Sequence, residues 1–240
     1  MPKENFVEEI KRLTKNIEGW LTNSEGEYLY SLAKNGQAKG VIVEIGSWKG
    51  KATIWLAAGT KQAKREKVYA IDHHRGSIEH DANVWTYPEF ERNIKQAGID
   101  DVVVPIIMKS EEAARGWNKP IRLLWIDGDH AYESIKQDFL SWEPHLVKRG
   151  IIALHDTTMW PGPKRLAEEY ICNSSKFRNM GFVASITFAE KTDKNCIADR
   201  LKNRISLFAR DMSLNFRLPR YLLVFGRKIL IALKLHPKIS

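Results

Sequence analysis

Short apolar runs alternate with longer amphipathic segments from residue 41 to residue 155. The first run, Val41-Ile-Val-Glu-Ile45, is rich in β-branched residues and nearly continuous in apolar ones, which is typical of a strand buried in a parallel sheet. The pattern predicts strands at 41–45, 67–72, 102–107, 122–127 and 150–155, and helices between them at 51–60, 88–98, 110–117 and 131–148.

This rhythm of strand and helix predicts an α/β fold, with a Rossmann-like doubly wound, mostly parallel sheet and helices on both faces. One more helix is expected at 161–172 and one more strand at 181–189. Ahead of the sheet, residues 1–17 have amphipathic helical spacing, and 24–35 form a second helix with Ser24 as N-cap and Glu27 completing a capping box. We therefore expect a helical cap at 1–40, the Rossmann-like domain at 41–190, and a basic amphipathic extension at 191–240.

The first strand runs into a glycine turn, where the chain breaks at Gly46 and a helix opens after Gly50. Such a turn leaves backbone N–H groups and the positive end of a helix dipole beside a crevice. Two glycines four residues apart do not make the three-glycine dinucleotide fingerprint. The expected ligand is therefore a nucleoside whose charged end is an amino acid. Asp72 closes the second strand, where its carboxylate can accept both hydroxyls of a ribose or serve as a turn residue.

Polar and charged residues gather at the carboxyl end of every predicted strand, which is the rim where open α/β sheets bind ligands. The fourth strand ends at Asp127-Gly-Asp-His130 and the fifth at His155-Asp156. A histidine at this rim suits general-base chemistry. The structural alternative is that Asp129 or His130 caps the helix that follows.

Four motifs carry a resemblance to a known family: Glu44-Ile-Gly-Ser with Gly50, Tyr69-Ala-Ile-Asp72, Ile126-Asp-Gly-Asp-His-Ala-Tyr132, and Gly150-Ile-Ile-Ala-Leu-His-Asp156. They resemble class I S-adenosylmethionine-dependent methyltransferases, and more narrowly the branch with small-molecule O-methyltransferases and cephalosporin-hydroxylase-like proteins. The resemblance implies that Asp72 holds the ribose. It also implies a cofactor-binding set in which Gly46, Ser47 and Gly50 contact the amino-acid end, Glu44 supports them, Ser110 edges the adenine, and Asp127 lies beside the cofactor.

Metal-dependent sugar and macrolide O-methyltransferases of this kind hold a divalent cation between the ends of strands four and five. The resemblance implies that Asp127 and Asp156 would bind such a cation, Mg²⁺ being the usual one, and that His130 would be the base. His155 stands where those enzymes carry another acid. It would be a third ligand, but hard Mg²⁺ prefers oxygen and imidazole suits softer metals, so this departure weakens the magnesium case.

The loop at 73–87 offers further candidates for the acceptor side. Its histidines, His73, His74 and His80, could line a substrate pocket, but loop histidines are mostly solvated, and we expect the same here. Aromatic side chains could instead form an acceptor wall or pack in the core. They are Trp85, Tyr87 and Trp160.

The net charge of +9 lies at the C-terminal end, because residues from Arg200 onward hold ten Lys/Arg and one acid. Over 213–240, a basic stripe and a broad apolar face predict an amphipathic helix lying on an anionic membrane surface. Its apolar runs are too short to span a bilayer. The alternatives are packing on its own domain and a homodimer contact; nucleic acid is the least favoured partner.

Together these features predict a methyltransferase that O-methylates a small-molecule or sugar (glycan) hydroxyl. The alternatives are an RNA methyltransferase that uses the basic tail, and a non-methylating hydroxylase-like or membrane-surface member of the same fold. With two cysteines and no apolar leader, we expect a cytoplasmic protein, peripheral at the membrane if the tail binds lipid. The sequence does not identify the acceptor.

Overall fold

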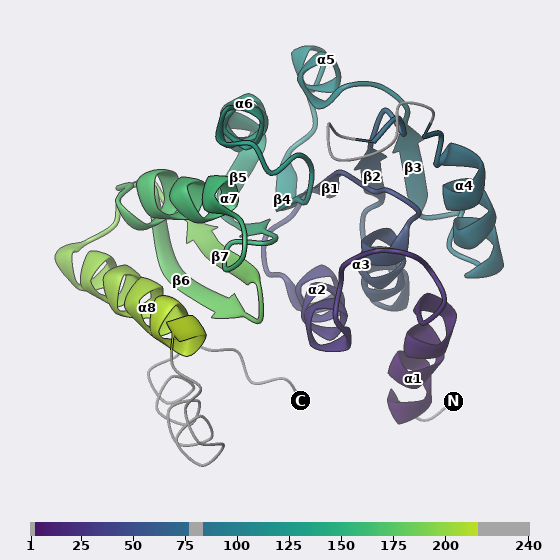
Figure 1. Cartoon of the computed structure of the whole chain (residues 1–240), viewed down its shortest axis with the longest axis horizontal. Coiled ribbons are helices and arrows are strands. Elements are labelled where there is room, and N and C mark those ends of the chain that lie inside the picture. The colour runs from purple at the N-terminus through teal and green to yellow at the C-terminus, as the bar shows by residue number, and fades with distance from the viewer. Residues whose placement is uncertain (1–2, 77–83, 216–240) are drawn as a thin grey trace.

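A seven-stranded sheet forms the centre of the protein, in the order β3-β2-β1-β4-β5-β7-β6 (Figure 1). The computed structural model describes residues 3–76 and 84–215. The first five strands are parallel, and β7 is antiparallel to both of its neighbours. The predicted fold class is confirmed. The strands are β1 (Val41–Ile45), β2 (Val68–Ile71), β3 (Val103–Ile106), β4 (Ile121–Ile126), β5 (Leu146–Leu154), β6 (Phe177–Val183) and β7 (Ile186–Lys191).

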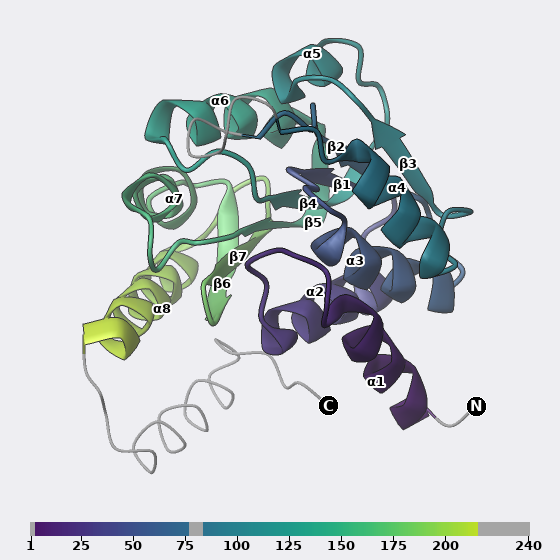
Figure 2. The same ribbon diagram turned by 45° about the vertical axis from the view of Figure 1, so that its right-hand side comes forward.

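Helices cover both faces of the sheet and bury two apolar cores (Figure 2). One core includes Trp55 and Phe90, and it is covered by α1 (Lys3–Thr14), α2 (Asn23–Asn35), α3 (Lys51–Gln62) and α4 (Tyr87–Gln96). The other includes Phe139 and Trp142, and it is covered by α5 (Ser110–Arg115), α6 (Tyr132–Trp142) and α7 (Pro161–Leu166). Strand order reverses between β1 and β4, so a crevice is expected beyond their carboxyl ends.

The start of α2 differs from the prediction in its cap. Thr22, not Ser24, is the N-cap, and Glu25, not Glu27, completes the capping box. Both pairs have the spacing of a capping box, so sequence alone does not choose between them. The choice matters because Glu25 reaches the functional site.

The helix predicted at 131–148 ends at Trp142, and the strand predicted at 150–155 begins earlier, at Leu146. Pro144 lies in the short 3₁₀ helix Glu143–His145 that separates them. Arg149 and Gly150, where the predicted helix and strand would meet, form an irregularity inside β5: Arg149 has φ 66°, and the pairing with β4 changes register there. A bulge and a turn use the same residue types.

The single strand predicted at 181–189 is a hairpin of two strands, β6 and β7. The chain turns at Ala184, which has φ 50°, a conformation that alanine rarely adopts and that sequence did not signal. The helix predicted at 161–172 is present as α7 continued by a π-helical turn, Ala167–Cys172.

The chain continues from β7 into α8 (Ile197–Asn215), which lies along the edge strand β6 (Figure 1). Among the described residues, no helix has both the length and the apolar character that a membrane span requires. The predicted amphipathic helix at 213–240 lies almost wholly outside the described residues.

Candidate functional site

The glycine turn after β1 is held against the start of the loop that follows β4. Gly46 has φ +83°, and a Cβ added there would lie 2.1 Å from the carbonyl oxygen of Asp127. Only glycine satisfies both conditions. Gly50, at φ +88°, starts α3 and faces Phe90 and Ile94 of α4. The turn therefore brings the ends of β1 and β4 into backbone contact.

Asp72 closes this turn from the neighbouring strand. Its Oδ2 accepts hydrogen bonds from the backbone N–H groups of Ser47, at 2.9 Å, and Trp48, at 2.8 Å. Its Oδ1 accepts the backbone N–H of His74 at 2.6 Å. Asp72 is thus a turn residue, which was the structural alternative to a ribose contact. A carboxylate has lone pairs beyond these three bonds, so the predicted ribose contact stays open as a prediction.

A cavity of about 680 Å³ lies over this rim, a size suited to a small-molecule ligand. Seven of the predicted site residues line it, and they lie just beyond the carboxyl ends of the five parallel strands, β1 to β5. They are Gly46, Ser47, Asp72, Ser110, Asp127, His130 and Asp156. The predicted residues Glu44, Gly50 and His155 are not among its lining residues. Gly50 therefore lies where it shapes the turn, and its position does not support the direct contact implied for it.

Glu44 is fully buried below the turn. Its Oε2 accepts a hydrogen bond from the Thr53 hydroxyl at 2.6 Å, and its Oε1 has no hydrogen-bond partner among the described residues. Burial raises the pKa of Glu44 well above its usual value, and the negative charges of Asp127 and Asp72 raise it further. A neutral carboxyl group therefore supports the turn.

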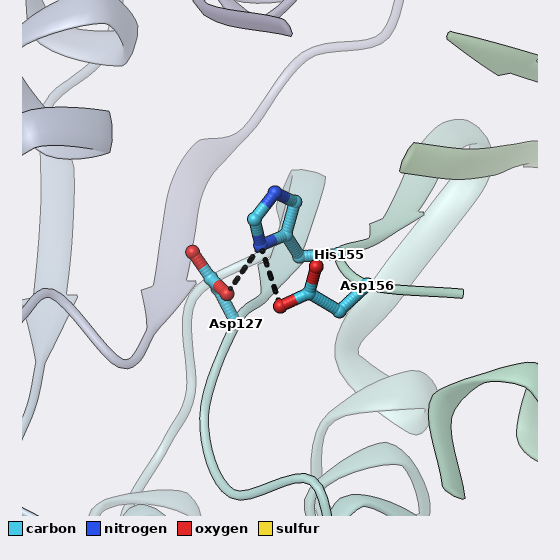
Figure 3. Close-up of side chains that lie close together, drawn as sticks. All are labelled: Asp127, His155 and Asp156. Atoms are coloured by element: carbon cyan, nitrogen blue, oxygen red, sulfur yellow. Dashed lines mark hydrogen bonds and ion pairs between the residues drawn. The ribbon is translucent and has the colours of Figure 1, made fainter. Parts of the chain in front are cut away.

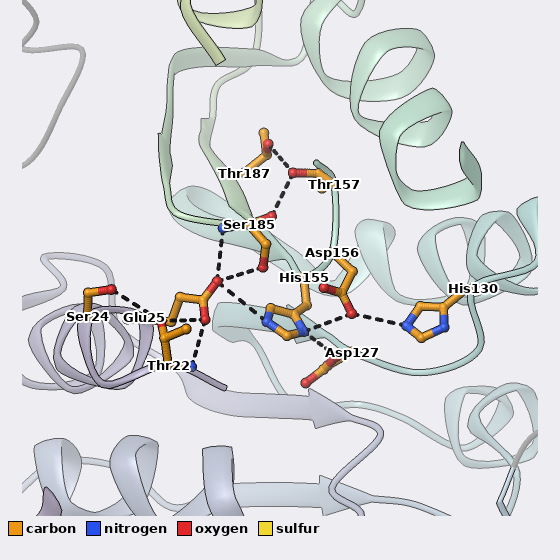
Figure 4. Close-up of polar contacts among 10 residues, drawn as sticks. All are labelled: Thr22, Ser24, Glu25, Asp127, His130, His155, Asp156, Thr157, Ser185 and Thr187. Atoms are coloured by element: carbon orange, nitrogen blue, oxygen red, sulfur yellow. Dashed lines mark hydrogen bonds and ion pairs between the residues drawn. The ribbon is translucent and has the colours of Figure 1, made fainter. Parts of the chain in front are cut away.

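His130 is held by Asp156 and by an aromatic ring. Its Nε2 lies 3.2 Å from Oδ2 of Asp156 (Figure 4). Its ring stacks on Trp160 with centroids 4.3 Å apart. Asp129 accepts the Ala131 backbone N–H at 2.9 Å and the Ser134 hydroxyl at 3.1 Å, which fixes the turn before α6. The N-cap of α6 is Ala131 and makes no side-chain cap, so the alternative that Asp129 or His130 caps this helix was wrong. His130 is turned toward the end of β5.

His155 is surrounded by carboxylates (Figure 3). Its Nδ1 lies 2.8 Å from Oδ1 of Asp127 and 3.4 Å from Oδ2 of Asp156. On the other side of the ring, Nε2 lies 3.6 Å from Oε1 of Glu25. Burial lowers the pKa of His155, but the three carboxylates outweigh it and raise the pKa to about 12. His155 is therefore a buried imidazolium.

Glu25 is a site residue that sequence reasoning missed. Its Oε1 accepts the Ser185 N–H at 2.9 Å and hydroxyl at 2.6 Å, and its Oε2 accepts the Thr22 N–H at 2.8 Å and hydroxyl at 2.7 Å (Figure 4). Burial raises its pKa, but the bonds to His155, Ser185 and Thr22 lower it to about 2. The capping-box spacing marks Glu25 as a cap, but no local signal shows that it meets β5.

The three predicted metal ligands do come together. Asp127, His155 and Asp156 each offer one ligand atom, all within 4.8 Å of one another. Mg²⁺ takes oxygen ligands in near-octahedral geometry, and this set supplies only two carboxylates. A ligating histidine must also be deprotonated, whereas both nitrogens of His155 face carboxylates. The donor set therefore does not fit magnesium.

One predicted residue, Ser110, and one that was not predicted, Asp138, lie in the wall of the cavity. Ser110 begins α5, and its hydroxyl accepts the indole N–H of Trp142 at 2.8 Å. Beside it, Asp138 lines the cavity, and burial raises the pKa of this carboxyl to about 6. Asp138 was not predicted, because its place in the middle of α6 gives no sequence signal.

The loop histidines differ from the expectation of solvated side chains. His74 is 1% exposed, and its Nδ1 lies 2.9 Å from the Thr86 hydroxyl among the rings of Trp85, Tyr87 and Phe90. It is a core residue, so the expectation was wrong for it. His73 lines the cavity, and His80 lies outside the described residues.

Comparison with known proteins shows what this chain is similar to. Residues 43–157 match the sequence profile of a family described as "Methyltransferase domain". The fold is similar to that of the O-methyltransferase NovP (17% identity, TM-score 0.64, 77% of this chain and 88% of that chain). It is also similar to the O-methyltransferase TomG from Streptomyces achromogenes, solved with S-adenosylmethionine (15%, 0.58, 78% and 89%), and to an O-methyltransferase from Bacillus cereus, solved with S-adenosylhomocysteine (19%, 0.57, 80% and 93%).

The profile match over residues 43–157, the strand order and the cavity over the glycine turn agree with the resemblance to class I S-adenosylmethionine-dependent methyltransferases that the four sequence motifs carry.

Proposed function

We propose that this protein is an S-adenosylmethionine-dependent methyltransferase that transfers a methyl group to a hydroxyl of a small molecule or sugar, with His130 as the general base. The observation that carries the proposal is the His130–Asp156 pair, which lines the same cavity as the glycine turn. A hydroxyl nucleophile has to lose its proton during methyl transfer, and this pair supplies an oriented base at the place where the acceptor would bind.

The cofactor would lie between the ends of β1 and β4. Its amino-acid end would meet the turn at Gly46 and Ser47 and the positive end of α3, and its ribose would approach Asp72. Asp127 would face the positive sulfonium. Holding the sulfonium methyl in line with the hydroxyl oxygen is the main physical task, and orientation of this kind supplies about 7–11 kcal/mol of the barrier in well-aligned reactions.

Asp156 decides which nitrogen of His130 acts. Because Nε2 faces Asp156, the neutral ring places its proton there and leaves Nδ1 as the basic atom. In the reaction the hydroxyl proton moves to Nδ1, the C–O bond forms as the S–C bond breaks, and S-adenosylhomocysteine leaves. The Asp156 carboxylate stabilises the imidazolium that results, as carboxylates do in hydrolase triads.

His155 would keep Asp156 in place for this task. Its imidazolium lies among Asp127, Asp156 and Glu25, where an internal cation neutralises charge that would otherwise repel. Asp156 has its pKa lowered, since its bonds to His130 and His155 outweigh burial, so it stays ionised.

Isothermal titration of the full chain with S-adenosylmethionine, followed by methyl transfer from labelled cofactor to a panel of phenols and methyl glycosides, tests the proposal. Asp72→Ala should weaken cofactor binding by about tenfold or more, because it removes charged hydrogen bonds at the turn. Binding without transfer to any hydroxyl, together with transfer to RNA, would replace this proposal with the RNA alternative.

A further inference from the structure

Helix α8 is amphipathic, but its polar face lies toward the domain and its apolar face toward solvent. Three polar side chains, Asn203, Ser206 and Arg210, are 0%, 1% and 1% exposed on the face toward the domain. Four large apolar side chains lie on the opposite face, and they form what we call the outer stripe. They are Ile197, Leu201, Ile205 and Phe208, at 78%, 59%, 41% and 66% exposed.

The polar inner face has a structural reason. β6 is an edge strand, and an edge strand presents unpaired backbone groups. Asn203 satisfies two of them, donating to the Phe177 carbonyl at 3.1 Å and accepting the Met180 N–H at 3.1 Å. Arg210 donates to the Thr187 hydroxyl of β7 at 3.1 Å. Polar groups are needed on the inner face, but nothing in the domain requires the apolar groups on the outer one.

The charges beside the outer stripe are basic. Arg200 and Arg204 flank it on one side and Lys202 on the other, and all three are exposed. The two acids of α8 are already engaged, since Asp199 accepts the Cys196 N–H and Asp211 pairs with Arg210. The surface is therefore apolar at its centre and positive at its rim.

We propose that the outer stripe of α8 docks on an anionic lipid surface. Charge complementarity favours this occupant over two others. A second copy would bring the same basic rim against its own, and the following segment, 216–240, holds six Lys/Arg and no acid, so it too would be repelled. Anionic headgroups attract the rim, while the interfacial region accepts the four apolar side chains.

Co-sedimentation of the full chain with vesicles tests this inference, independently of methyl transfer. We expect binding to phosphatidylcholine vesicles that contain phosphatidylserine, and much weaker binding to phosphatidylcholine alone. Leu201→Glu combined with Phe208→Glu should weaken partitioning by about tenfold or more, because two apolar groups that would insert into the lipid interface are replaced by charges that anionic headgroups repel. Arg200→Gln combined with Arg204→Gln should weaken it less and reduce its salt dependence.

Leu140→Glu is the matched control, since Leu140 is 48% exposed on α6, away from the outer stripe. It should bind vesicles as the wild type does. Unchanged circular dichroism and cofactor binding in every variant exclude unfolding as the cause. The inference is overturned if the α8 double variant binds as well as the wild type, or if the wild type ignores phosphatidylserine and forms a dimer that the double variant disperses.

Discussion

The two halves of the cavity rim are held by different kinds of interaction. On the β1–β2 side, the turn at Gly46 is fixed by backbone geometry and by backbone N–H groups that meet Asp72. On the β4–β5 side, the chain of Glu25, His155, Asp156 and His130 consists of side-chain charges. The buried acids differ accordingly: Glu44 under the turn is neutral, whereas Glu25 beside His155 is ionised.

This difference predicts that substitutions in the two halves affect cofactor binding and turnover separately. A change in the turn half should lower affinity for the cofactor, whereas a change in the charged half should lower turnover. The largest expected effect is on His130→Ala, which removes the base and should lower turnover by about 10²–10⁴-fold with cofactor affinity unchanged. His73→Ala, a second histidine of the cavity wall, is the control. Turnover close to wild type in His130→Ala would assign the base elsewhere.

Gly46→Ala tests the turn half. The added Cβ would overlap the Asp127 carbonyl and adopt a left-handed φ, and strain of this kind costs about 1–3 kcal/mol, so cofactor binding should weaken by about tenfold or more. Gly116→Ala is matched, because a Cβ there meets nothing within 4 Å. Titration calorimetry measures both variants. Normal affinity in Gly46→Ala would show that the cofactor does not depend on this turn.

His155→Asp removes the imidazolium cation from the charged half, so a bound metal ion would have to replace it. With Asp127, Asp156 and Glu25, the introduced carboxylate makes four clustered acids that repel one another without a cation. The variant should therefore unfold at a lower temperature and gain Mn²⁺ binding, seen by electron paramagnetic resonance, that restores its thermal stability. His155→Asn should lose stability without gaining a metal. Tight Mn²⁺ binding by the wild-type chain would contradict the proposed role of His155.

Glu44→Gln should have the smallest effect, and its sign depends on pH. Because the folded pKa of Glu44 is raised, its unfolded form releases a proton above about pH 4.5 that the folded form keeps. Wild-type stability is therefore lost progressively as pH rises above that value, and glutamine avoids this loss. Urea unfolding at acidic and mildly alkaline pH should show the variant gaining relative to wild type, while exposed Glu133→Gln shows no such trend.

The sequence placed the rim well because its signals are local. The strands from β1 to β4 follow from continuous apolar runs, and parallel topology then brings Asp72, Asp127 and Asp156 to one edge whatever the details of packing. Gly46 was recognisable since a strand followed by glycine predicts a turn. The acceptor and the cytoplasmic location stay predictions.

Other features depended on contacts between distant segments. Glu25 meets Ser185 across 160 residues, and neither residue differs locally from an ordinary cap or turn. The hairpin at Ala184 and the polar inner face of α8 follow from the needs of an edge strand, which exist only once the sheet is assembled. The sequence by itself determined the fold class, the glycine turn and the acids of the rim, because these depend on residue type and strand order. Tertiary structure alone decided which groups are charged, since burial and neighbouring carboxylates set the protonation of Glu44 and His155.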